Sequence, residues 1–302
     1  MGFSKGIESK DAAPLKRYIG IAPVYVVAVN PTKAELEKIY DREITNDPTY
    51  LGTSNITVGG VEKEVASMRL DFIIKTDPNV NNGIEVIDKV TFFLNNENRF
   101  NSDATKVQVI DKYGRTAWAT VEELETKSIP QYSNGPAALD EDFRAALIGE
   151  EALTSFIIDY LNLPNPQNYK NGKWVDKTPK EMEQCRARFG NLTNIFKGDI
   201  SEVKDAIGLQ PNNKIKVLFG VKTTDEGNMY QDIYNRKFMK SSSSYKNSLV
   251  KDVTNSQDNG AYPNTEFSFT PLREYSVEAT DFSTEAPDPF DGVSGIAKNP
   301  FN

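Results

Sequence analysis

Alternation of apolar and polar residues predicts several β-strands in the first half of this chain. Four stretches carry the pattern: Tyr18–Asn30, Val65–Lys75, Glu85–Leu94 and Lys106–Ala119, the last with a bend at Lys112–Arg115. A capping box, Thr32-Lys33-Ala34-Glu35, predicts a short helix that ends at Tyr40. Residues 41–64 lack a clear period, so we expect a loop there, with a turn at Gly59-Gly60.

The longest alternation runs from Lys214 to Phe238 and predicts a β-hairpin. It breaks at residues 223–228, whose Gly and Asn can adopt the positive φ of a tight turn. One side of the second strand carries aromatic rings and a guanidinium: Tyr230, Tyr234, Arg236 and Phe238. These rings can stack on unpaired bases or, alternatively, cap the protein core.

A helical period replaces the alternation after Gly135-Pro136. Helices are expected at Asp140–Leu163, Thr178–Gly190 and Asp199–Ile207. Between the first two helices, residues 165–177 are expected to form a loop. Residues 241–260 are a polar stretch with four consecutive serines, and Thr265–Thr270 is a candidate final strand.

Strands on both sides of a helical block predict an α+β protein that is mainly β. We expect an OB-fold-like barrel over residues 16–275, with a helical insertion at about 136–210. Residues 1–15 are expected to be a flexible N-terminus, and residues 276–302 a disordered acidic C-terminal tail. A two-layer α+β domain has the same pattern, and periodicity does not separate the two folds.

The residue types present exclude most catalytic and metal sites. The chain has no histidine and one cysteine, Cys185, which excludes Cys/His zinc sites, Ser-His-Asp triads and Cys-His dyads. Acid pairs such as Glu150-Glu151 lie on a predicted helix, so we interpret them as a solvated face rather than a carboxylate–metal nuclease site. The chain also lacks a phosphate-binding glycine motif. We therefore expect no enzyme, no metal and no cofactor.

Neither a membrane span nor a targeting segment is predicted. No apolar run reaches about 18 residues, and the first residues lack the apolar core of a secretory signal. Gly6 stands where a myristoylation site needs Ser or Thr. The single cysteine suggests a reducing compartment. We expect a soluble, cytoplasmic protein that binds no membrane.

The net charge of −8 is concentrated near the C-terminus. From Glu274 onward six acids face one base, Lys298, so the rest of the chain carries only −3. A near-neutral body can still present a basic groove. The tail can solubilise the protein, bind a partner, or occupy that groove in competition with nucleic acid. We expect partner binding through Phe282, Asp288, Phe290, Asp291 and Phe301.

Basic and aromatic residues are interleaved in three of the predicted strand regions. If these strands are neighbours in a sheet, they form a platform on which bases stack while cations hold phosphates. For any single residue, core packing is the alternative. The expected stacking residues are Tyr113, Trp118, Tyr230 and Tyr234, and the expected phosphate contacts are Arg69, Lys112, Arg115, Lys222, Arg236 and Lys237.

Four segments together resemble single-stranded-DNA-binding proteins of large tailed, crAss-like bacteriophages. They are RLDFIIKT (69–76), VTFFL (90–94), VQVIDKYGRTAWA (107–119) and GVKTTDEGNMYQDIYNRKF (220–238). The resemblance implies an OB-fold core, preferential binding of single-stranded DNA, and a role in phage DNA replication or recombination in the cytoplasm of the infected bacterial host. The acidic C-terminus is similar to tails that recruit a polymerase or helicase. A hypothesis from a different class is a phage structural or packaged virion protein without DNA-binding activity.

Overall fold

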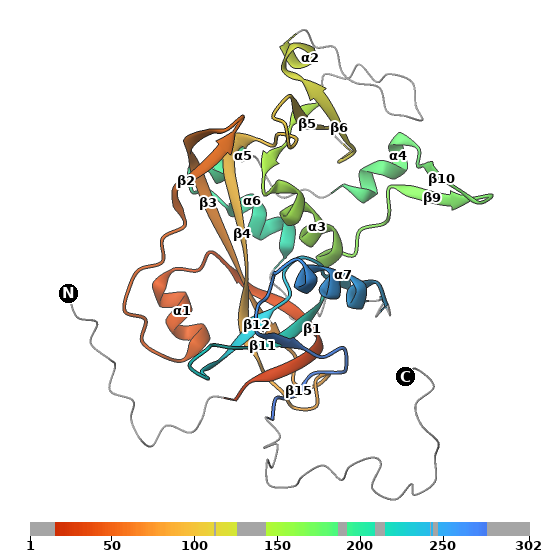
Figure 1. Cartoon of the computed structure of the whole chain (residues 1–302). Coiled ribbons are helices and arrows are strands. Elements are labelled where there is room, and N and C mark those ends of the chain that lie inside the picture. The colour runs from red at the N-terminus through yellow and green to blue at the C-terminus, as the bar shows by residue number, and fades with distance from the viewer. Residues whose placement is uncertain are drawn as a thin grey trace, which may run out of the picture.

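The computed structural model describes residues 16–111, 113–125, 143–186, 192–208, 215–241, 243 and 247–276, and these residues are mainly β (Figure 1). The strands are β1 (Tyr18–Val29), β2 (Leu51–Val58), β3 (Val61–Thr76), β4 (Ile87–Asn98), β5 (Lys106–Ile110), β6 (Thr116–Thr120), β7 (Arg144–Ala145), β8 (Leu147–Ile148), β9 (Gln167–Lys170), β10 (Lys173–Asp176), β11 (Ile215–Thr223), β12 (Met229–Ile233), β13 (Met239–Lys240), β14 (Thr265–Phe267) and β15 (Arg273–Glu274). The helices are α1 (Lys33–Tyr40), α2 (Val121–Glu125), α3 (Glu150–Tyr160), α4 (Pro179–Met182), α5 (Leu192–Ile195), α6 (Ser201–Ile207) and α7 (Asn247–Asp258), with a 3₁₀ turn at Glu183–Cys185. Within these residues, no helix is long and apolar enough to cross a membrane.

A curled antiparallel sheet of ten strands forms the body of the molecule. The strand order is β12-β11-β1-β3-β4-β8. β2 pairs with the first half of β3, and β1 pairs with its second half. A register shift between Val26 and Ala28 interrupts the β1–β3 ladder, and such bulges increase the twist of a strand. The curl brings Phe238, just beyond β12, to within 6.4 Å of Phe92 on β4, measured between ring centroids.

The main core lies between the inner face of this sheet and helices α3, α5 and α6. On β3 the alternation predicted from the sequence sends Met68, Leu70 and Phe72 inward, where they are buried. Phe156 of α3 packs 5.0 Å from Phe72 between ring centroids. The hydroxyl of Tyr160 accepts a hydrogen bond from the Val26 amide, so this buried polar group is satisfied.

A second, smaller core lies on the opposite face of β11. Helix α7 places Leu249 and Val253 there, four residues apart on one helix face. They pack with Leu218 and Tyr234. The stretch at 241–260, seen in the sequence only as polar, therefore contains a helix that covers the sheet.

The strands expected in the first half, the capped helix α1, the β11–β12 hairpin and the strand near Thr265 are confirmed. Several expectations are wrong. The helix expected over Thr178–Gly190 ends early, because α4 stops at Met182, a 3₁₀ turn follows to Cys185 and Arg186 is extended. Glu150, interpreted as part of a solvated helix face, is buried and pairs with Arg144. Residues 41–64 contain β2, and residues 165–177 contain the β9–β10 hairpin. The helix expected from Asp140 begins only at Glu150, because the preceding residues pair as β7 and β8 and Gly149 turns the chain with a φ of 88°. The described part of the insertion, residues 143–186 and 192–208, is thus a mixture of short strands and helices.

Candidate nucleic-acid interface

The three basic–aromatic strand regions do not form one platform. β3 and β11 both pair with β1 but not with each other, and β5 and β6 belong to a separate three-stranded sheet with β7. Figure 1 shows β5 and β6 at the top of the view and the β11–β12 hairpin near the bottom. The predicted residues therefore fall into three groups, of which the first lies on the outer face of β3 and β4.

Arg69 belongs to the first group, and Phe93 is its partner across the β3–β4 ladder. Phe93 is 59% exposed although it lies in the middle of a strand. The Arg69 guanidinium lies over the Tyr50 ring, 5.3 Å from its centroid, which holds the guanidinium beside the Phe93 strand. We name Tyr50, Arg69, Lys89 and Phe93 the β3–β4 patch.

The charges of the β3–β4 patch leave a positive excess. Asp71 is buried and lies 3.3 Å from the Arg69 guanidinium and 3.5 Å from the Lys89 ammonium. The Thr91 hydroxyl donates to the other carboxylate oxygen of Asp71. One carboxylate thus holds two cations in place, and the second positive charge is available to an anion. Arg69 lies on the outer face of the sheet, and its orientation is fixed by Tyr50 and Asp71. Its role as a phosphate contact stays a prediction.

Sequence reasoning missed Phe93, although the signal for it was present. Phe92 and Phe93 are adjacent in a strand, so their side chains must point to opposite faces. Phe92 is buried against Phe72 and Phe156, which leaves Phe93 on the outer face. The adjacent aromatic pair therefore indicated that one ring lies on the outer face of this strand.

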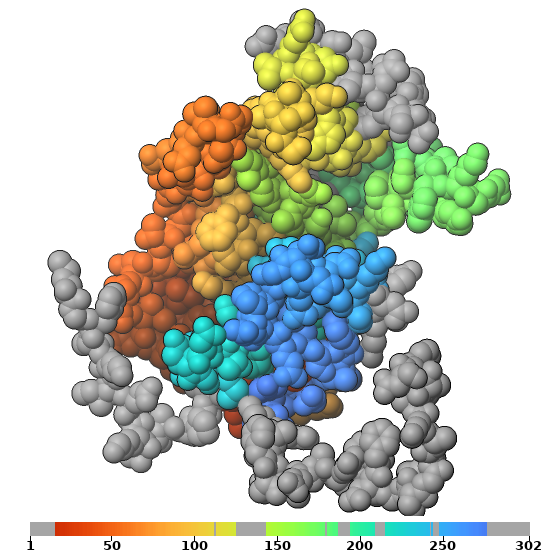
Figure 2. All heavy atoms as spheres, viewed as in Figure 1, coloured from red at the N-terminus to blue at the C-terminus, as the bar shows by residue number. Residues whose placement is uncertain are grey.

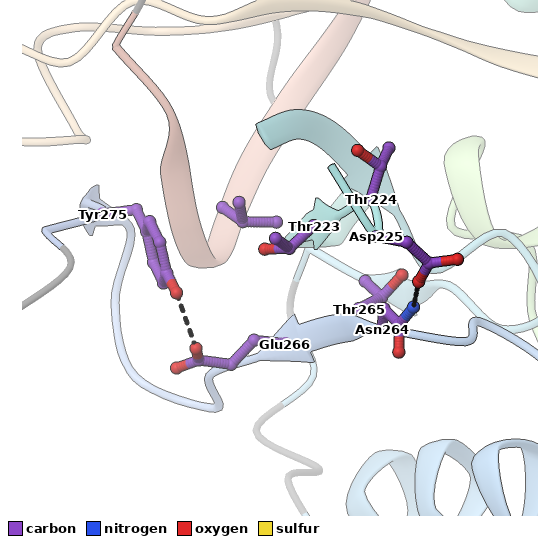
Figure 3. A pocket seen from close by; sticks show the side chains of 8 residues that line it. Thr223, Thr224, Asp225, Asn264, Thr265, Glu266 and Tyr275 are labelled. Atoms are coloured by element: carbon purple, nitrogen blue, oxygen red, sulfur yellow. Dashed lines mark hydrogen bonds between the residues drawn. The ribbon is translucent and has the colours of Figure 1, made fainter. Parts of the chain in front are cut away.

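The second group is the end of the β11–β12 hairpin, where Lys222 and Tyr230 lie directly opposite each other. Both are exposed, Tyr230 by 52%. We name this pair the hairpin tip. A shallow pocket of about 610 Å³ lies beside it (Figure 3). Its walls carry the carboxylates of Asp225 and Glu266, which disfavour a phosphate.

The rest of the hairpin face is covered, and this corrects the prediction for Tyr234. Its side chain is fully buried, and its hydroxyl donates to the Asp252 carboxylate on α7 at 2.7 Å. Burial raises the pKa of Tyr234 to about 12. Arg236 is exposed and Lys237 half-buried, and both follow the end of β12, away from the Tyr230 position. Tyr234 therefore belongs to the core and does not stack on bases.

The third group surrounds the bend between β5 and β6. Trp118 is 40% exposed on β6. Arg115 lies over the Tyr113 ring, 5.7 Å from its centroid, and Tyr113 is half-buried. The Arg115 Nε donates to Asp111 at 2.7 Å and its Nη1 to Asp176 at 3.4 Å. Two carboxylates compensate this guanidinium and fix it at the bend. Its role as a phosphate contact stays a prediction.

Lys112 and the tail residues Phe282, Asp288, Phe290, Asp291 and Phe301 lie outside the described residues, as does the N-terminal segment before residue 16. Within the described ranges, cysteine and acidic side chains form no group of three or more that could hold a metal ion. Comparison with protein-family models, curated proteins and solved structures gives no match to this chain. The function must therefore be argued from the geometry of the three groups.

Proposed function

We propose that this protein binds single-stranded DNA without sequence preference, mainly through the β3–β4 patch. The observation that carries the proposal is the Phe93 ring, exposed on a sheet face directly opposite the Arg69 guanidinium. Every base has an aromatic face, so such a ring accepts any base. Paired bases in a duplex do not offer that face, which makes the site selective for a single strand.

The charges beside the ring suit a sugar–phosphate backbone. Lys89 and Arg69 share Asp71, and the remaining positive charge can hold one phosphate while the base stacks on Phe93. The hairpin tip adds a second exposed ring, Tyr230, directly opposite Lys222. Base–aromatic stacking contributes about 1–3 kcal/mol per base, so two or three such rings are enough for useful affinity.

The finer parts of the proposal rest on the resemblance to phage single-stranded-DNA-binding proteins. The curled sheet is compatible with an OB-like barrel whose strands present their outer face to DNA. The protein then acts in phage DNA replication or recombination in the host cytoplasm. The acidic tail, residues 276–302, then recruits a polymerase or helicase.

The test is a titration of fluorescent oligo-dT, and of an equal-length duplex, at about 50 and about 200 mM salt. The full chain is expected to bind the single strand only, and more weakly at the higher salt concentration. Phe93→Ala should lower the affinity for oligo-dT by about 5- to 150-fold, as loss of one stacked base predicts.

The matched control is Val61→Ala, which removes another exposed apolar side chain from β3. It should leave the affinity within about two-fold, since an exposed side chain without a role rarely matters. Equal losses in the two variants would show that the Phe93 ring is not a stacking site. If the full chain binds neither DNA, the proposal fails and a virion protein becomes the better hypothesis.

A further inference from the structure

The β9–β10 hairpin projects from the body of the molecule, at the right of the view in Figure 2. Asn171 and Gly172 both have positive φ, 50° and 78°, as a two-residue hairpin turn requires. Tyr169 and Trp174 are cross-strand partners with ring centroids 5.2 Å apart. They are 64% and 59% exposed. Two large rings therefore face solvent side by side on a short two-stranded element.

The face of the hairpin that carries the rings adjoins the third group of predicted residues, at the bend between β5 and β6. We name Tyr113, Arg115 and Trp118 the bend group. Alternation along the strands puts Gln167 and Asp176 on the same face as the ring pair, one cross-strand step closer to the hairpin base. Asp176 accepts from the Arg115 guanidinium, and that guanidinium lies over the Tyr113 ring. The face of the hairpin is thus continuous with the surface that carries the bend group.

Lysines occupy the end of the hairpin. Lys170 and Lys173 are cross-strand partners next to the turn, and both are exposed. Alternation directs their side chains to the face opposite the ring pair. Like charges directly opposite each other destabilise a strand pair. An anion beside the two ammonium groups removes this repulsion. The acid on the hairpin, Asp176, is already bonded to Gln167 and Arg115. Near Lys170 lies Glu181 of α4, whose carboxylate is hydrogen-bonded to Thr178.

We propose that the β9–β10 hairpin is a second contact for single-stranded nucleic acid, with bases stacked on Tyr169 and Trp174 and phosphates held by Lys170 and Lys173. The inference rests on the proposed function and extends it by naming a contact distant from the β3–β4 patch. Charge complementarity selects the occupant, because a single strand that crosses the edge of this two-stranded hairpin can place bases on the ring face and phosphates within reach of the two long lysine side chains. A DNA strand long enough to reach the hairpin binds more tightly than one that covers only the patch.

The chain has two tryptophans, Trp118 and Trp174, which makes the hairpin directly observable. In the Trp118→Phe variant of the full chain, all indole fluorescence comes from Trp174. Addition of oligo-dT should quench this emission, with saturation at the same DNA concentration as fluorescence anisotropy of the labelled DNA. Tyr169→Ala with Trp174→Ala should weaken binding of a long oligo-dT at least five-fold and change binding of a short one less.

Four outcomes are distinguished. Quenching of Trp174 together with the loss in the double variant supports the proposal. If the Trp118→Phe variant binds oligo-dT while Trp174 emission stays constant, the hairpin proposal is overturned and the proposed function stands. If the full chain binds no oligo-dT, both fall. A Trp174 response to vesicles of phosphatidylcholine and phosphatidylserine, without one to DNA, overturns the proposal in favour of a membrane contact.

Discussion

The outer face of β3–β4 and the α7-facing side of β11–β12 are built from similar residues but have different surroundings. On β3–β4, Phe93 is exposed beside the Arg69 guanidinium. On β11–β12, Tyr234 is fully buried, and the aromatic–cationic combination persists only where Tyr230 faces Lys222 at the hairpin tip. Aromatic residues near basic ones are thus exposed on β3–β4 but buried on the α7-facing side of β11–β12.

Covering elements account for the difference. Helix α7 contributes Leu249 and Val253 to the cluster around Tyr234. Phe267 of β14 packs onto the backbone at Gly220, where a Cβ atom would lie 2.6 Å from the Phe267 ring. The absence of a side chain at Gly220 therefore allows Phe267 to pack directly against β11. The composition of a strand face therefore does not determine whether the face is exposed. That depends on whether segments distant in the sequence, here α7 and β14, pack over it.

The largest expected effect comes from the adjacent pair Phe92 and Phe93. Phe92→Ala leaves a cavity in the main core and should lower the free energy of unfolding by about 3–5 kcal/mol. Phe93→Ala should change it by less than about 0.5 kcal/mol, since that ring is exposed. Urea unfolding of both variants measures the contrast. Similar losses of stability would mean that Phe93 is also part of the core.

The strands of the sheet could be predicted well where apolar and polar residues alternate along the chain, as on β3. Prediction failed at β2 and at the β9–β10 hairpin, whose exposed residues carry no apolar period. The Asn171-Gly172 turn was a usable signal for the second of these. Which candidate residues share a surface could not be predicted, because strand order and the position of α7 depend on long-range packing.

A smaller effect is expected from the charge of Asp88 on β4. Burial raises the pKa of its carboxyl to about 6, so the folded state favours the neutral form. The wild-type protein therefore loses stability as the pH rises from about 4 through about 6, where the carboxyl ionises. Asp88→Asn should raise the free energy of unfolding by about 1–2 kcal/mol at pH 8 and leave it unchanged near pH 4. A gain of equal size at both pH values would contradict this assignment.

The smallest expected effect concerns Lys89. It follows Asp88 on β4, and its side chain lies on the opposite, exposed face of the sheet. Lys89→Gln should leave stability within about 0.5 kcal/mol, because Lys89 is half-exposed and the buried Asp71 keeps its contacts with Arg69 and Thr91. It should reduce the slope of log affinity against log salt for oligo-dT by about 0.7, the value for one lost phosphate contact on a single strand. An unchanged slope would show that Lys89 holds no phosphate. Stacking on Phe93 would then be the remaining contribution of the β3–β4 patch.

The pairing of β1 with β11 has a consequence for synthesis of the chain. Gly20 pairs with Phe219, so about 200 residues separate partners that lie side by side in the sheet. At about 5–20 residues per second, a ribosome takes about 10–40 s to supply β11 after β1 has emerged. During that interval β1 has an open edge and an uncovered apolar face, which are the features that chaperones recognise in nascent chains. The open edge of β1 is therefore paired only after β11 and β15, both in the last third of the chain, have been synthesised.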